Sequence, residues 1–274
     1  MSPRAPGRPD RTAPRTEAEL DDLLSRPGHA ALWATQFCDL LRPQFREDSR
    51  VWAEAAYRIQ GRVLAEIHAG VRASAWKVGS AHPDVEPTAA PIARSLMYES
   101  PANLPARGFR IIGVEAEIAF RFARELPPRA EAYSEPELAD AVAEALVAIE
   151  MCDSRLADWR SVDPLWKLAD SQMNAALVLG SRVPDWRNVD FTTQAVELWV
   201  DGACKVSARG SHPFGNPFCL LPWAANHVAR RSGGLRAGDV VTTGSWTGME
   251  FVPAGAEVTA RFAGIGEACV RLPV

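Results

Sequence analysis

Val114-Glu115-Ala116-Glu117-Ile118-Ala119-Phe120 places two glutamates inside a run that otherwise has the pattern of a buried strand. Because strand side chains alternate between the two faces of a sheet, Glu115 and Glu117 are expected on one face, about 6.5–7 Å apart. The residues that alternate with them are apolar and would face a core. Two interpretations are open here: a solvated sheet face, or a shared divalent cation, since Mg²⁺ and Mn²⁺ prefer carboxylate oxygens.

A third carboxylate, Glu150, ends the apolar run Ala145-Leu146-Val147-Ala148-Ile149. A glutamate at the end of a buried strand either faces a site at that edge or loses its hydration without compensation. Directly downstream, Asp153 and Arg155 are expected to pair as a structural bridge. Asp170 fits either a helix cap or a polar group of the site, and spacing does not separate these alternatives.

Lysine is scarce in this chain: only Lys77, Lys167 and Lys205 are present among 30 basic residues. Lys77 lies in the small, apolar run Ser74-Ala75-Trp76-Lys77-Val78-Gly79. Burial there would lower the pKa of the ammonium group and let it transfer protons or anchor a carboxylate, whereas a guanidinium group does not give up its proton. The alternative is a lysine that extends to solvent from the end of a strand.

The apolar pattern changes after Gly70. Before it, helical periodicity predicts three helices, near residues 16–26, 31–41 and 48–69. After it, short or alternating apolar runs predict strands at 72–78, 110–123, 145–151, 175–180, 195–200, 203–208, 238–243, 256–262 and 267–273. Two helices, near 135–144 and 217–231, interrupt these strands.

Asp201-Gly202 joins two of the predicted strands and is typical of a tight hairpin, because both turn positions tolerate positive φ. The resulting fold class is α+β, with an N-terminal helical subdomain followed by a mixed-sheet core. The expected organisation is a disordered Arg- and Pro-rich tail at 1–16, a helical subdomain at 17–70 and a catalytic domain at 71–274.

The composition excludes several classes of protein. The 274 residues are 47% hydrophobic and 23% charged, so the chain is not intrinsically disordered. The formal net charge of −4 argues against nucleic acid as a partner, and no apolar stretch approaches the ~20 residues of a membrane span. Five widely spaced cysteines argue against a disulfide framework or a zinc site. We therefore expect a cytoplasmic enzyme.

A series of motifs also occurs in a recognisable order along the chain: Trp76-Lys77-Val78-Gly79, Val114–Phe120, Ala148-Ile149-Glu150, Asp153-Ser154-Arg155, Asp158-Trp159, Ala169-Asp170, Val178-Leu179-Gly180, Gly215-Asn216-Pro217, Gly238-Asp239 and Gly244-Ser245. This set resembles the 2-keto-4-pentenoate hydratase and 4-oxalocrotonate decarboxylase branch of the fumarylacetoacetate hydrolase superfamily, from about residue 17 to the C-terminus. The resemblance implies a twisted, mixed β-roll core of the superfamily's C-terminal type, preceded by a helical part.

The resemblance also implies a site. It assigns Mg²⁺ or Mn²⁺ to Glu115, Glu117 and Glu150, and a glutamate as third ligand is typical of hydratases and decarboxylases, whereas hydrolases of the superfamily usually carry aspartate. It assigns catalytic roles to Lys77, Glu86 and Asp170. It assigns substrate contacts to Gly79, Arg155 and Ser245.

Two segments depart from the pattern of the family. The loop after the Lys-x-Gly motif usually contains Asp-Glu-Pro-Asp, whose second aspartate is a proposed proton-transfer group; this chain has Thr88 there, and Glu86 is the candidate substitute. The segment after Asp170 is usually Asn-Ala-Ser-Ser-like and here is Ser171-Gln172-Met173-Asn174, so we expect a different arrangement of water.

The function implied by the resemblance is a metal-dependent hydratase of 2-hydroxy-dienoates or 2-keto-enoates in the catabolism of aromatic compounds or steroids. The alternatives are a 2-oxo acid decarboxylase on the same scaffold, an acylpyruvate-type hydrolase and a weakly active partner subunit. The expected partners are a small 2-oxo acid substrate, further copies of the chain, and a decarboxylase, hydratase or aldolase of the same pathway.

Overall fold

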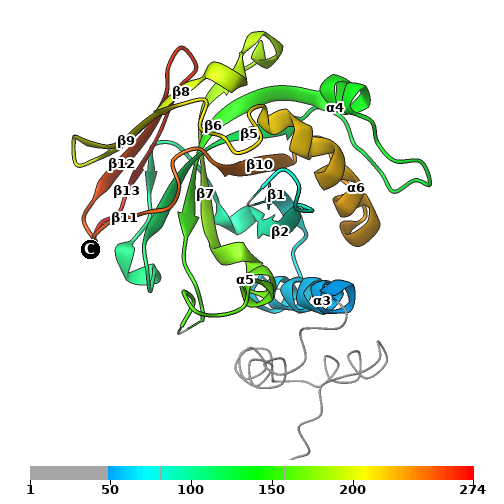
Figure 1. Cartoon of the computed structure of the whole chain (residues 1–274). Helices are drawn as coiled ribbons and strands as arrows, with labels where there is room; N and C mark the ends of the chain where they lie inside the picture. The colour runs from blue at the N-terminus through cyan, green and yellow to red at the C-terminus, as the bar shows by residue number, and fades with distance from the viewer. Residues whose placement is uncertain (1–48, 69, 81, 157) are drawn as a thin grey trace, which may run out of the picture.

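The computed structural model describes residues 49–68, 70–80, 82–156 and 158–274, which form two packed β-sheets flanked by helices (Figure 1). The larger, eight-stranded sheet has the spatial order β2 (Thr88–Ala93), β1 (Ala73–Gly79), β10 (Val240–Ser245), β5 (Gly113–Phe122), β6 (Val142–Cys152), β7 (Asn174–Val183) and β3 (Met97–Glu99), and β11 (Glu250–Phe251) pairs with β5. The five-stranded sheet has the order β4 (Ala102–Asn103), β13 (Gly266–Arg271), β12 (Glu257–Phe262), β8 (Ala195–Val200) and β9 (Ala203–Arg209). The α-helices are α3 (Ser49–Ile67), α4 (Glu135–Ala141), α5 (Pro164–Ala169) and α6 (Leu221–Ser232).

Strand β5 separates two environments, because its alternate residues face opposite sides of the larger sheet. Ala116, Ile118 and Phe120 are fully buried in the main apolar core, together with residues of the smaller sheet and of α6. Ala119 belongs instead to a smaller apolar cluster on the other face, which also contains Leu146 of β6. The glutamates of β5 lie on the face of this smaller cluster.

The pairing of the central strands places the site. β1 runs parallel to β10, with Lys77 beside Thr242, and β10 runs antiparallel to β5. β5 and β6 are antiparallel and pair Glu115 with Glu150. The larger sheet is therefore mixed, and the predicted α+β class is confirmed.

The hairpin prediction is also confirmed. β8 and β9 pair across a turn at Asp201 and Gly202, whose φ angles are 50° and 76°. Glycine adopts positive φ without steric cost, and aspartate tolerates it better than most residues. Helix α3 matches the third N-terminal helix expected from the apolar periodicity. The two earlier helices and the predicted disordered tail lie outside the described residues.

Several predicted boundaries are wrong. The helix expected at 135–144 ends at Ala141, because the chain continues directly into β6 at the β-branched Val142, which is extended. The helix expected at 217–231 begins as a 3₁₀ turn over Pro217–Leu220 before α6 starts. β2 was missed because it is short, alanine-rich and interrupted by Pro91, which is typical of an edge strand.

Candidate active site

Three carboxylates meet on one face of the larger sheet. Glu115 and Glu117 of β5 lie on this face, and Glu150 of β6 is the direct neighbour of Glu115 across the two strands. Glu117 and Glu150 are 0% exposed, and Glu115 is half-buried. The alternative of a solvated sheet face is therefore wrong, and the carboxylates form a cluster in the protein interior.

This concentration of negative charge changes how the carboxylates titrate. Burial raises the pKa of Glu117 well above its ordinary value, and the carboxylates of Glu150 and Glu115 raise it further. Burial likewise raises the pKa of Glu115, although the Lys77 ammonium opposes this shift. Two carboxylate oxygens, Oε1 of Glu117 and Oε2 of Glu150, are buried without a hydrogen-bond partner among the described residues. A cluster with unpartnered acceptors suits a cation.

Lys77 reaches this cluster from β1. Its Nζ lies 2.7 Å from Oε1 of Glu150 and donates a 3.2 Å hydrogen bond to the backbone oxygen of Gln172. Burial alone would lower the pKa of Lys77, but the nearby carboxylates, with Glu150 first, outweigh that effect and raise it above the ordinary value. The expected lowering of this pKa is therefore wrong: the side chain of Lys77 is only 13% exposed, but the lysine is a charged partner of Glu150.

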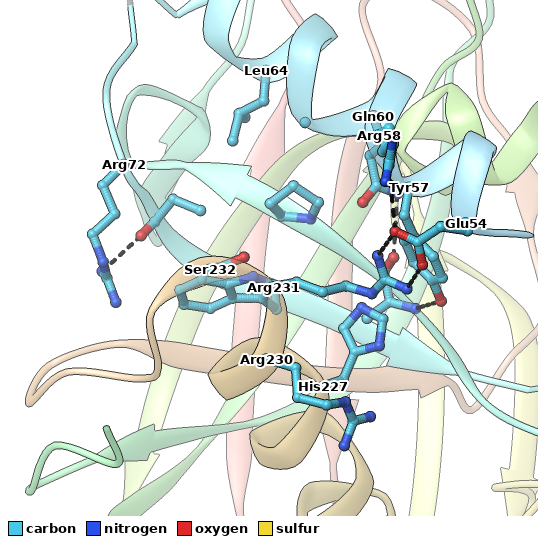
Figure 2. Close-up of a pocket in the computed structure, with 15 residues that line it drawn as sticks. Glu54, Tyr57, Arg58, Gln60, Leu64, Arg72, His227, Arg230, Arg231 and Ser232 are labelled. Atoms are coloured by element: carbon cyan, nitrogen blue, oxygen red, sulfur yellow. Dashed lines mark hydrogen bonds and ion pairs between the residues drawn. The ribbon is translucent and has the colours of Figure 1, made fainter. Parts of the chain in front are cut away.

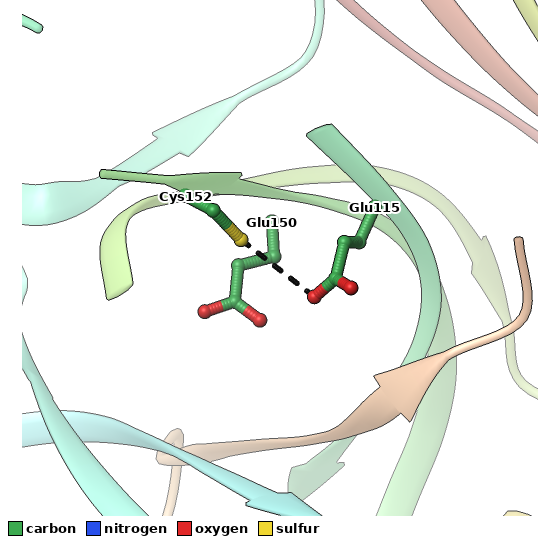
Figure 3. Close-up of side chains that lie close together, drawn as sticks. All are labelled: Glu115, Glu150 and Cys152. Carbon is green, nitrogen blue, oxygen red and sulfur yellow. Dashed lines mark hydrogen bonds between the residues drawn. The ribbon is translucent and has the colours of Figure 1, made fainter. Parts of the chain in front are cut away.

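Among the described residues, Glu115, Glu150 and Cys152 form a group whose potential ligand atoms lie within 4.8 Å of one another (Figure 3). The Sγ of Cys152 is 3.6 Å from Oε2 of Glu115. We did not predict Cys152 as a site residue, although its position two residues beyond Glu150 places it on the same face of the sheet. Burial raises the pKa of the Cys152 thiol well above its ordinary value and keeps it protonated, so it is a poor ligand for a hard cation.

Asp170 and Arg155 form an ion pair with each other. Nε of Arg155 lies 2.6 Å from Oδ1 of Asp170, and Oδ2 of Asp170 accepts hydrogen bonds from Ser154 Oγ and the Arg155 backbone N–H. The expected Asp153–Arg155 bridge is wrong, because Asp153 instead accepts hydrogen bonds from the backbone N–H groups of residues 110 and 111. Asp170 is both the C-cap of α5 and the partner of Arg155.

Two of the remaining predicted residues lie at the ends of strands, and the third, Glu86, lies between β1 and β2. Gly79 closes β1 opposite Thr88, and Ser245 closes β10 opposite Glu117. The hydroxyl of Ser245 donates a 3.2 Å hydrogen bond to the Gly248 backbone oxygen and also opposes the rise in the pKa of Glu115. Glu86 is exposed, and its carboxylate accepts a 3.4 Å hydrogen bond from the indole of Trp223 in α6. Gly79 and Ser245 are thus beside the cluster, whereas Glu86 contacts a helix.

The segment after Asp170 also contacts the cluster, and we did not assign it a role from the sequence beyond its departure from the family. Nδ2 of Asn174 donates a 2.8 Å hydrogen bond to Oε1 of Glu150. The side-chain amide of Gln172 donates a hydrogen bond to Oγ1 of Thr88. Both residues lie where the sequence departs from the family pattern, and this departure is the sequence signal that could have identified them as site residues.

A separate cavity of about 550 Å³ lies between α3 and α6, beside β1 and β2 (Figure 2). Trp76 lines it, whereas the adjacent Lys77 points to the carboxylates on the other face of β1. At one wall, Arg231 pairs with Glu54 and its guanidinium lies over the ring of Tyr57. This cavity is distinct from the carboxylate cluster.

His227 forms part of the same wall and makes stability depend on pH. Its ring is buried between those of Tyr57 and Trp223, each with a centroid 4.6 Å away. Burial, followed by the charges of Arg231 and Arg230, lowers the pKa of His227 from 6.5 to about 3. The imidazole is therefore neutral in the folded protein at neutral pH.

We expect His227 to make the protein less stable as the pH falls below 6.5. The unfolded chain takes up the proton at higher pH than the folded chain, so the unfolded state is favoured progressively between 6.5 and about 3. At pH 5 this group alone should lower the free energy of unfolding by about 2 kcal/mol relative to pH 7.5. Urea unfolding of the protein and of His227→Phe at both pH values measures the contribution, because phenylalanine preserves the ring packing and does not titrate. Equal pH-dependent losses in the two proteins would contradict it.

No helix among the described residues is long and apolar enough to span a membrane.

Comparisons with known proteins agree with this architecture. The chain is 35% identical to a 2-keto-4-pentenoate hydratase of Paraburkholderia phymatum, over 78% of this chain and 84% of that protein. It is 34% identical to a 2-keto-4-pentenoate hydratase of Burkholderia vietnamiensis, over 72% and 77% of the two chains. The fold is also similar to that of a 4-oxalocrotonate decarboxylase from Pseudomonas putida G7, whose structure is complexed with magnesium and adipate. The two structures superpose with a TM-score of 0.76 at 19% identity, and the superposition covers 94% of this chain and 98% of the decarboxylase chain. Residues 72–272 match the fumarylacetoacetate hydrolase C-terminal model, and the chain belongs to that family.

Proposed function

We propose that this protein is a divalent-metal-dependent hydratase that adds water to a 2-hydroxy-dienoate or 2-keto-enoate. One observation carries the proposal: three carboxylates and a lysine share a buried sheet face in a chain that is hydratase-like over most of its length. The reaction class is that of a carbon–oxygen lyase. The decarboxylase structure is only 19% identical to this chain, so its similarity supports the fold and not the reaction.

Glu115, Glu117 and Glu150 are the proposed metal ligands. The carboxylate donors and the unpartnered oxygens of Glu117 and Glu150 fit Mg²⁺ or Mn²⁺, which are hard cations that prefer oxygen. Oε2 of Glu117 accepts hydrogen bonds from Thr242 Oγ1 and the Gly244 backbone N–H, which fix the orientation of this carboxylate. When bound, such a cation supplies Lewis acidity that polarises the keto group of a 2-oxo acid.

The side chains around the ligands have proposed roles that follow from their contacts. The charged ammonium of Lys77 is placed to bind a substrate carboxylate and to hold a proton beside Glu150. Asp170 fixes the Arg155 guanidinium, whose side chain is 47% exposed and accessible to a substrate anion. Gly79 and Ser245 contribute the strand ends that border the site. Glu86 remains a candidate acid, although its carboxylate contacts Trp223.

Product analysis of the full-length protein with Mg²⁺ tests this function. With 2-hydroxypentadienoate we expect loss of the conjugated absorbance and incorporation of one ¹⁸O atom from labelled water into a hydroxylated 2-oxo acid. With 2-oxohexenedioate we expect no stoichiometric release of CO₂. Release of CO₂ from the second substrate without hydration of the first would favour the decarboxylase alternative. The absence of both reactions would eliminate both the hydratase and the decarboxylase functions.

The protein is also proposed to act as a homo-oligomer and to associate with a decarboxylase, hydratase or aldolase of its pathway. The replacement of the loop acid by Thr88 motivates the related alternative of a weakly active partner subunit. Robust turnover by the purified chain alone would eliminate that alternative. Negligible turnover that appears only with a second subunit would support it.

A further inference from the structure

The turn after α5 has an unusual backbone. Ser171, Gln172 and Met173 have φ angles of 56°, 52° and 66°. None of them is glycine, and an L side chain in this region costs roughly 1–2 kcal/mol. Strain of this kind persists where surrounding contacts hold it, and it clusters at functional sites. The contacts of the turn therefore indicate what it does.

Two hydrogen bonds from the turn, and one from Asn174 directly after it, reach Lys77, β2 and the carboxylate cluster. The backbone oxygen of Gln172 accepts from Lys77, and Asn174 donates to Glu150. The side-chain Nε2 of Gln172 donates to Oγ1 of Thr88. Gln172 is thus bound through its backbone to a proposed catalytic residue and through its amide nitrogen to the strand that borders the site.

The amide oxygen of Gln172 is buried and has no hydrogen-bond partner among the described residues. A buried acceptor without a donor costs about 1–3 kcal/mol. Because the nitrogen end of the amide is occupied by Thr88, the oxygen end is available to a ligand. An amide oxygen accepts hydrogen bonds but does not take up a proton at neutral pH, so it suits the recognition of a hydroxyl group.

The two departures from the family pattern therefore contact each other. Thr88 stands where an acid is usual, and Gln172 lies in the altered segment after Asp170. A threonine hydroxyl can accept the amide hydrogen bond and leave the amide oxygen free. A carboxylate at position 88 could accept the same hydrogen bond but would add a negative charge beside the site.

We propose that Oε1 of Gln172 accepts a hydrogen bond from the hydroxyl group of a hydroxylated 2-oxo acid, which makes Gln172 a specificity-determining residue. This inference rests on the proposed hydratase function, because that hydroxyl oxygen is the one that hydration adds. A site that hydrogen-bonds a hydroxyl group rejects an analogue without it, since the acceptor is then left buried and unpaired. An acceptor on one side of the substrate also favours one enantiomer of the product.

Binding of a matched pair of ligands tests the inference. Calorimetry with the full-length protein and Mg²⁺ compares 4-hydroxy-2-oxopentanoate with 2-oxopentanoate, which differ only in the hydroxyl group. We expect the protein to prefer the hydroxylated ligand by about tenfold, as one hydrogen bond predicts. Gln172→Met should lose this preference while its affinity for 2-oxopentanoate stays within about twofold, because methionine has a similar length and meets the same backbone strain.

A second variant keeps the test informative if Gln172→Met does not fold. Thr88→Val retains the amide but removes the hydroxyl that fixes it, so the preference should fall without disappearing, and the enantiomeric excess of the hydration product should fall with it. An unchanged preference in the variant that folds, or no preference in the unmodified protein, would overturn the inference. The unmodified protein could also show no hydratase turnover and still lose its preference for the hydroxylated ligand on substitution. That result would support the inference about Gln172 and overturn the proposed reaction.

Discussion

Replacing Glu117 by glutamine is expected to remove tight binding of Mn²⁺ and with it the hydration activity. Glu117 is 0% exposed, and its Oε1 has no partner among the described residues, so it is positioned to donate to a cation shared with Glu115 and Glu150. Loss of an outer-shell partner typically lowers metal affinity by about 10–100-fold, and loss of a direct ligand should exceed about 100-fold. The metal-free variant should melt no lower than the unmodified protein, because the substitution removes an ionisable group from a crowded acidic site.

Calorimetric or EPR titration with Mn²⁺ measures the affinity, and a thermal melt of the metal-free protein measures the stability. Glu125→Gln is a matched control, because Glu125 is exposed and outside the cluster. Equal Mn²⁺ affinity in the unmodified protein and Glu117→Gln would refute the assignment of Glu117 as a ligand. A large loss of affinity in Glu125→Gln would show that the effect is not local.

Lys77→Met is expected to lower kcat/KM for hydration by about 10²–10⁴-fold, the range typical of a lost proton-transfer or charge-positioning group. The ammonium is 2.7 Å from Glu150 and is the only described Lys, Arg or His side chain that forms an ion pair with a carboxylate of the cluster. Affinity for Mn²⁺ should not fall, because the substitution removes a positive charge from the neighbourhood of the proposed ligands. Steady-state kinetics combined with the Mn²⁺ titration therefore distinguishes the role of Lys77 from that of the proposed metal ligands.

Two further variants control for this result. Lys205→Met changes another of the three lysines at an exposed position on β9 and should leave kcat/KM unchanged. Lys77→Arg keeps the charge but replaces a compact ammonium, whose Nζ lies 2.7 Å from Glu150, by a bulkier, planar group, so it should recover at most a small part of the activity. Full activity of Lys77→Arg would show that only the charge is needed, and full activity of Lys77→Met would eliminate the role.

Strand periodicity predicts that two of the three carboxylates of the candidate site share one face of a strand, but it leaves open whether that face is solvated. The period of two places Glu115 and Glu117 on one face, and the apolar run that precedes Glu150 indicates a second buried strand. Both signals are local, because they depend only on neighbouring residues. What they cannot supply is the register between β5 and β6, which makes Glu115 and Glu150 direct neighbours.

The failures have a common physical origin in contacts between distant segments. The sequential proximity of Asp153 and Arg155 suggested an ion pair, but Asp170 competes for the same guanidinium from 15 residues away. Likewise, the burial of Lys77 could be predicted, but the sign of its pKa shift depends on Glu150, which lies 73 positions along the chain from Lys77. The strained turn at residues 171–173 has no local sequence signal, because glycine is absent from it.

The division of β5 between core and site bears on how this scaffold can diverge. A substitution at one of its alternating positions alters either the packing against Phe120 and Ile118 or the charge beside Glu115 and Glu117, so few single changes are neutral there. The turn at residues 171–173 contacts Lys77, the ion-pair partner of Glu150, without contributing a strand to the sheet. We therefore expect substrate preference to diverge through such turns, while β5 keeps its two carboxylates.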